Sequence, residues 1–219
     1  MNYIIIFLLT FLVFKASSND ECMTANEILT DECKEKIKEF YVNKEEGFLN
    51  EEYIEDKWTV KVIQHEKDKR KWAVYASVNG KVTNGDRLRV RILTEDENSC
   101  EYGNTITSFY TTISNAKTLN FSNDIIPANF KGEVINIKLL FANRFLSGYS
   151  VTIDMGWNHL DSIKEYFQGL KKVDLKLLDS GTIKIKEYFD INENTFSLNA
   201  LNEALERAKK ECIKIIKHK

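Results

Sequence analysis

Proline and glycine are scarce in this chain, whose 219 residues include one Pro and nine Gly. Their scarcity excludes collagen-like and low-complexity proteins. An excess of one charge sign is also lacking, because 31 Lys and Arg stand against 33 Asp and Glu. The net charge of −2 therefore predicts no nucleic-acid partner and no charge-driven membrane partner. The 43% hydrophobic and 29% charged residues are typical of a soluble globular protein and exclude a disordered one.

No apolar run reaches the length of about 20 residues that a membrane-spanning helix needs. The longest run covers residues 3–14, in which only Thr10 is polar. This length is typical of a secretory signal-peptide core, and the small residues Ala16 and Ser18 follow it. The alternative is a buried helix or an uncleaved anchor, because no Lys or Arg precedes the run. We predict a signal peptide over residues 1–18, an exported protein (periplasmic or extracellular), and no stable membrane span after cleavage.

Cysteine is present in an even number, which implies disulfides in an exported chain. The four cysteines are Cys22, Cys33, Cys100 and Cys212. They allow three connectivities, and we prefer Cys22–Cys33 with Cys100–Cys212. The first pair closes a short segment, and the second ties the middle of the chain to its last predicted helix. A metal site is the alternative, but the sequence has no C-x-x-C pair and no His at ligand spacing from a Cys.

The segment before the main domain is predicted to be helical and then irregular. Thr24 and Glu27 match a capping box, and apolar residues recur at helical spacing as far as Tyr41. Residues 43–57 are acidic, and their apolar residues show no helix or strand period. We therefore divide the mature chain into a helical segment with a linker, residues 19–57, and a β-rich α+β domain, residues 58–219.

From Trp58 onward, apolar residues alternate with polar ones at a period of two, which indicates strands. The dipeptides Asn79-Gly80 and Asn84-Gly85 are turn signals between them. The predicted strands lie at residues 58–62, 71–78, 88–92, 105–114, 134–145 and 149–157. The pattern indicates six or seven antiparallel strands arranged as a meander or a sandwich.

The last quarter of the chain mixes helices and strands. Asn158 is the predicted N-cap of a short helix, and residues 173–177 and 182–186 are predicted to pair as a hairpin. Ser197 is the predicted N-cap of a final amphipathic helix. The apolar stripe of that helix contains Leu198, Leu201, Leu205, Ala208, Cys212 and Ile215. The predicted fold is thus α+β: an antiparallel β-rich body with an N-terminal helix and this C-terminal helix packed on it.

Recognisable catalytic and cofactor motifs are missing, including G-x-S-x-G, H-E-x-x-H, the Walker loop and the dinucleotide fingerprint. Asp154 and His159 flank Trp157 at a strand-to-helix turn and form the one segment that resembles a catalytic site. A small secreted hydrolase would need both side chains in one pocket. Helix capping and a core Trp157 explain the same residues, and we favour that interpretation because no complete constellation is present. We predict no catalytic residue and no cofactor.

Residues 190–195 begin like an EF-hand loop, with Asp190, Asn192 and Asn194 at alternate positions. However, Thr195 replaces the required Gly, and Leu201 occupies the position of the bidentate Glu. We therefore predict no metal site here. The segment is interpreted as a polar loop whose side chains satisfy backbone groups.

Three arginines, Arg87, Arg89 and Arg91, share one face of a predicted strand. Together with basic residues of a nearby hairpin loop they form a possible anion-binding patch. Those loop residues are Lys67, Lys69, Arg70 and Lys71. The alternative is a solvated sheet face in which carboxylates on neighbouring strands pair with the arginines.

These observations favour an exported, non-enzymatic binding protein. Its partner would be an unknown protein or an anionic ligand, bound through the Arg patch or exposed aromatic residues. Two alternatives stay open: a small secreted hydrolase using Asp154 and His159, and an inhibitor or effector that acts on a partner protein through a protruding loop at residues 64–71.

Overall fold

A computed structural model describes residues 57–64, 69–83, 85–119 and 124–218 of the chain. Within these residues the strands are β1 (Thr59–Gln64), β2 (Lys71–Asn79), β3 (Arg87–Leu93), β4 (Tyr102–Thr111), β5 (Ile125–Phe130), β6 (Glu133–Phe145), β7 (Gly148–His159), β8 (Lys172–Leu177) and β9 (Glu193–Ser197). The α-helices are α2 (Leu160–Tyr166) and α3 (Leu201–Lys217). The 3-10 helices are η2 (Asn98–Glu101), η3 (Ser114–Leu119) and η4 (Ile185–Glu187).

Several predictions concern residues outside the described ranges. They are the leader at 1–18, the helix that begins at Thr24, the pair Cys22–Cys33, and the loop residues His65 and Lys67. All of these stay predictions.

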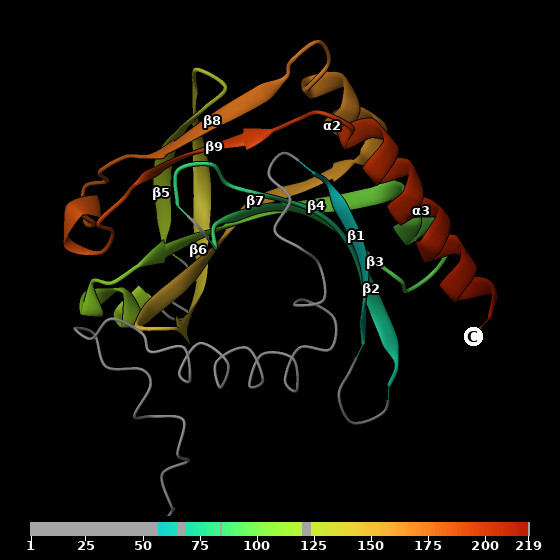
Figure 1. Cartoon of the computed structure of the whole chain (residues 1–219), viewed down its shortest axis with the longest axis horizontal. Coiled ribbons are helices and arrows are strands. Elements are labelled where there is room, and N and C mark those ends of the chain that lie inside the picture. The colour runs from blue at the N-terminus through green and yellow to red at the C-terminus, as the bar shows by residue number, and fades with distance from the viewer. Residues whose placement is uncertain (1–56, 65–68, 84, 120–123, 219) are drawn as a thin grey trace, which may run out of the picture.

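The strands form one antiparallel sheet in the order β1-β2-β3-β4-β7-β6-β5-β8-β9. Neighbours in the sheet are mostly neighbours in sequence, so the predicted meander is confirmed for β1–β4, and the predicted sandwich is replaced by a single sheet. Figure 1 shows the sheet bending sharply between its two halves, with β1–β3 on one side and β5–β6 on the other. The bend brings β9 back toward β2.

The predicted strands from β1 to β4 and from β6 to β8 are confirmed, but two parts of the later chain differ from expectation. Strand β5 was not predicted and contains the only proline, Pro127, whose carbonyl oxygen accepts from Leu178 N at 3.0 Å. The predicted strand at 182–186 is wrong. Ile183 N donates to Ser180 Oγ at 2.9 Å and Ile185 N donates to Asp179 Oδ1 at 2.9 Å. Because these side chains satisfy the backbone, the segment needs no strand partner.

The partner of β8 is β9, which begins at Glu193 and replaces the predicted polar loop. Asn194 lies on this strand and is buried. Its Oδ1 accepts from Val82 N at 3.0 Å and from Thr195 N at 2.8 Å, so the prediction that these polar side chains satisfy backbone groups is confirmed for Asn194.

Part of the core lies between the sheet and α3, which covers β1, β2 and β3 (Figure 1). On β3 the even residues Leu88, Val90 and Ile92 are buried, so the alternation predicted the core face of this strand correctly. The buried stripe of α3 consists of Leu201, Ala204, Leu205, Ala208, Cys212 and Ile215. Burying each large apolar side chain contributes about 1.5–3 kcal/mol, so this packing supplies much of the stability.

The predicted starts of both helices are shifted by a few residues. Helix α3 begins at Leu201, and its N-cap is Ala200 with a φ of 61°, not Ser197. Ser197 Oγ accepts from Asn199 N at 3.3 Å and so stabilises the turn that precedes the helix. Helix α2 is capped by His159 and not by Asn158.

The two ends of the sheet are joined at a seam between β2 and β9. Gly80 forms a bridge with Phe196, and Trp58 Nε1 donates to Ser197 O at 3.0 Å. Asp86, fully buried, links this seam to β4, because it accepts from Asn194 Nδ2 at 2.8 Å and from Tyr110 N at 2.6 Å. One buried carboxyl group therefore links the seam to β4.

At the turn between β6 and β7, Gly148 lies against the backbone of β4. A Cβ atom at this position would lie 2.2 Å from Thr111 O and 2.9 Å from Tyr110 Oη. We expect Gly148→Ala to lower the free energy of unfolding by about 1–3 kcal/mol, measured by urea denaturation, because the backbone must shift. The control is Gly181→Ala, since no described atom lies within 4 Å of its Cβ position. Equal effects of the two substitutions would contradict the close approach.

Candidate functional site

The three arginines of β3 project from the sheet face opposite the core. This orientation follows from the strand period of two, because the residues between them are buried. The residues directly across on the neighbouring strands are Asn79, Ser77 and Tyr75 on β2, and Ser108, Ile106 and Asn104 on β4. All six are uncharged. The alternative interpretation expected carboxylates at these cross-strand positions, and none of the six is one.

Neutral oxygen atoms hold each arginine in place. Arg87 Nε donates to Asn79 Oδ1 at 3.1 Å, and Arg89 Nη1 donates to Ser108 Oγ at 3.2 Å. Arg91 Nη2 donates to Asn104 Oδ1 at 3.0 Å. These bonds orient the guanidinium groups.

Arg91 has a contact that the sequence pattern did not predict. Its guanidinium carbon lies 5.5 Å from the ring centre of Trp157, a cation–π geometry worth about 0.5–1 kcal/mol at an exposed site. Its Nε is buried and has no hydrogen-bond partner among the residues that the structure describes. A buried donor without an acceptor costs about 1–3 kcal/mol, so a movement of Arg91 that brought Nε to an anionic acceptor would recover that energy.

Asp154 takes part in this arrangement through Asn104. Its Oδ1 accepts from Asn104 Nδ2 at 2.7 Å and from Gly156 N at 2.8 Å. The second bond stabilises a β-bulge, where the register between β4 and β7 shifts and Gly156 has a φ of 106°. Asp154 therefore orients the amide that holds Arg91, and it fixes the bend of β7.

His159 has a different role from the one the hydrolase alternative requires. Its Nδ1 accepts from Asp161 N at 3.3 Å as the N-cap of α2, and its Nε2 lies 3.8 Å from Glu101 Oε2. Asp154 and His159 lie five positions apart on one strand, which corresponds to roughly 16 Å at 3.3 Å per residue. The structure does not bring the two side chains together, and this geometry gives the hydrolase alternative no support.

Two exposed aromatic rings lie on the same face of the sheet as Arg91. Trp157 is 45% exposed and Tyr102 is 43% exposed, so the prediction of a core Trp157 is wrong. The Tyr102 and His159 rings meet edge to face at 5.3 Å. We call the set Arg91, Asn104, Tyr102, Trp157 and His159 the Arg91–Trp157 surface.

The predicted basic loop residues lie elsewhere. Lys69, Arg70 and Lys71 line a pocket together with the end of α3, and not with the Arg91–Trp157 surface. No group of three or more His, Cys, Asp or Glu side chains suited to a metal ion occurs within the described segments. Among those segments, neither helix has the length and apolar character needed to cross a membrane.

Comparisons with protein-family models, with curated proteins and with solved structures find no match for this chain. Its function is therefore inferred from the geometry of the surface alone.

Proposed function

We propose that this chain is an exported, non-enzymatic binding protein that docks an acidic partner protein on its Arg91–Trp157 surface. The carrying observation is Arg91 itself: a guanidinium oriented by an amide and an indole, whose buried Nε–H has no acceptor among the residues that the structure describes. Such a group is suited to a carboxylate, because a guanidinium and a carboxylate can form two parallel hydrogen bonds.

The neighbouring residues favour a protein partner. Trp, Tyr and Arg are the residues most enriched among those that carry the binding energy of protein–protein interfaces. Trp157 and Tyr102 are large, partly exposed rings that lose little conformational entropy on binding, and the Arg91 guanidinium lies over the indole of Trp157. Arg89 lies two residues before Arg91, on the same strand and the same face.

Export is supported by the disulfide between Cys100 and Cys212, because such bonds persist in oxidising compartments. The signal-peptide pattern of residues 1–18 agrees with it. The non-enzymatic part of the proposal is supported by Asp154 and His159, which hold a bulge and a helix N-terminus.

Charge reversal at Arg89 and Arg91 should remove the binding. With poly-L-glutamate as a defined acidic polypeptide, we expect the double variant Arg89→Glu/Arg91→Glu to bind at least about thirtyfold more weakly, because about 2 kcal/mol of attraction is lost. Titration calorimetry at fixed ionic strength measures the affinity of the full chain. Trp157→Ala should weaken binding similarly without changing the charge.

The matched control is Arg144→Glu/Arg207→Glu, which reverses two exposed arginines on β6 and α3. If the control lowered the affinity as much as the β3 variant, only net charge would matter, and the proposed surface would be wrong. Unchanged affinity in Arg89→Glu/Arg91→Glu would also refute it.

A further inference from the structure

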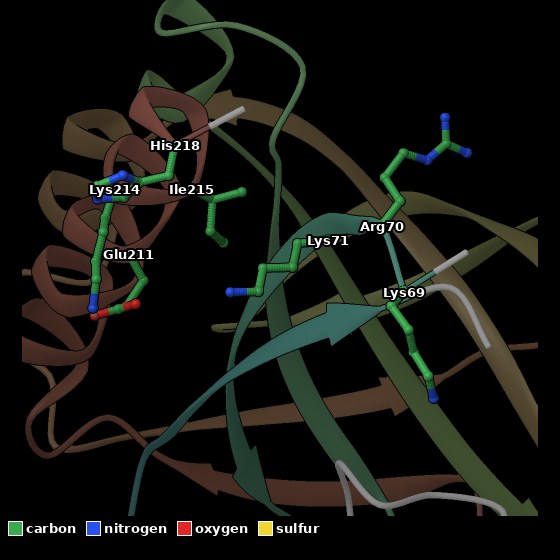
Figure 2. Close-up of a pocket in the computed structure, with 7 residues that line it drawn as sticks. All are labelled: Lys69, Arg70, Lys71, Glu211, Lys214, Ile215 and His218. Carbon is green, nitrogen blue, oxygen red and sulfur yellow. Dashed lines mark ion pairs between the residues drawn. The ribbon is translucent and has the colours of Figure 1, made fainter. Parts of the chain in front are cut away.

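A basic pocket lies where the start of β2 meets the end of α3 (Figure 2), on elements that the Arg91–Trp157 surface does not use. Its volume is about 300 Å³. The lining residues are Lys69, Arg70, Lys71, Glu211, Lys214, Ile215 and His218. This volume is at the lower end of the range for small-molecule sites, which favours a small ligand.

The charge of the lining is strongly positive. Among the described residues that line it, the cations Lys69, Arg70, Lys71 and Lys214 outnumber the one carboxylate, which belongs to Glu211. The whole chain carries −2, so this concentration is not a consequence of overall composition. A concave site lined by one sign of charge concentrates the field and attracts counter-ions.

The cations come from two segments that are far apart in sequence. Figure 2 shows Lys71 extending toward α3, where Lys214 and Glu211 lie, whereas Arg70 and Lys69 project away from the helix at the rim. A cation near a helix C-terminus is explained by the helix dipole, which accounts for Lys214. The dipole does not account for the three consecutive basic residues from the other segment.

The ion pair between Glu211 and Lys214 is loose. Lys214 Nζ lies 3.9 Å from Glu211 Oε1, and both side chains are well exposed to solvent. Exposed pairs of this kind contribute about 0–1 kcal/mol, so a dianion can compete for the lysine. Ile215, which is buried, forms the apolar base of the pocket.

We infer that this pocket binds a phosphate group, either as the free ion or as the headgroup of a lipid. Lys71 from β2 and Lys214 from α3 would contact the phosphate oxygens, and Lys69 would attract the ligand from the rim.

Titration with inorganic phosphate, at constant ionic strength with chloride as the balancing anion, tests the inference. We expect saturable shifts of amide NMR resonances around Lys71 and Lys214. The variant Lys71→Gln/Lys214→Gln should bind phosphate at least about tenfold more weakly, because two charge-assisted contacts are lost. The control Lys176→Gln/Lys184→Gln removes two exposed lysines elsewhere and should leave the affinity unchanged.

A second arm separates the two sources of phosphate. The protein is sedimented with phosphatidylcholine vesicles that contain or lack phosphatidic acid. A lipid headgroup is the ligand if the wild type sediments only with the vesicles that contain phosphatidic acid and the variant Lys71→Gln/Lys214→Gln stays in solution. Phosphate binding with no response to phosphatidic acid identifies the free ion.

Non-saturable shifts with phosphate together with no vesicle binding would overturn the inference, as would equal losses in the pocket and control variants. Phosphate affinity should be unchanged in Arg89→Glu/Arg91→Glu, which keeps this test independent of the proposed function.

Discussion

Replacing both Cys100 and Cys212 with Ala is expected to lower the free energy of unfolding by about 4–5 kcal/mol. The bond joins residues 112 positions apart and fastens η2, at the end of β3, to the buried face of α3. In the chain-entropy model, closing a loop of about 100 residues lowers the conformational entropy of the unfolded state, which raises its free energy by about 4.7 kcal/mol. Guanidinium denaturation without reductant measures this difference.

The same experiment contains its own control. Addition of dithiothreitol should destabilise the wild-type chain strongly, and it should affect Cys100→Ala/Cys212→Ala much less because the long-range bond is already missing. A double variant within about 1 kcal/mol of the wild type would contradict this role for the disulfide.

The stability of the protein should fall as the pH rises toward neutrality because of Asp86. Burial raises the pKa of this carboxyl from 3.8 to about 7, against the opposing effect of hydrogen bonds from Tyr110 N and Asn194 Nδ2. Folding therefore favours the protonated acid. The contribution of the protonated Asp86 side chain to the free energy of unfolding is complete below pH 3.8 and is lost as the pH rises through about 7. The difference in pKa corresponds to about 4 kcal/mol.

The difference in unfolding free energy between wild type and Asp86→Asn isolates this effect, because other titrating groups are common to both. We expect the wild type to lose stability relative to the variant between about pH 4 and pH 7, the range between the two pKa values of Asp86. Asp174→Asn, at an exposed carboxylate on β8, should follow the wild-type profile. Parallel profiles for wild type and Asp86→Asn would show that the carboxyl at the seam stays ionised throughout.

Much of the sheet was predictable because residue alternation reports directly which face of a strand is buried. Leu88, Val90 and Ile92 illustrate this. The same signal failed at Ile183 and Ile185, which are buried although their backbone is satisfied by Asp179 and Ser180 and not by a strand. Alternation identifies burial, but it does not identify the partner of the backbone.

The candidate site was predictable only in part. The positions of Arg89 and Arg91 followed from the alternation of β3, but the aromatic neighbour did not. Val151 and Ile153 are buried, and uninterrupted alternation would place Trp157 with them in the core. The bulge at Gly156 moves Trp157 to the opposite face, beside Arg91. A glycine inside a strand pattern was the available signal, and its effect becomes clear only with the register of β4.

The side-chain resonances of Arg91 and Trp157 test the proposed docking surface most directly. During titration of the full chain with poly-L-glutamate, the Arg91 Nε–H and Trp157 indole N–H signals should shift together and saturate. The Trp58 indole, which donates to Ser197 O in the core, should remain in place. If the Arg91 and Trp157 signals stayed unchanged, or if the Trp58 signal moved in step with them, acidic polypeptides would not bind at this surface.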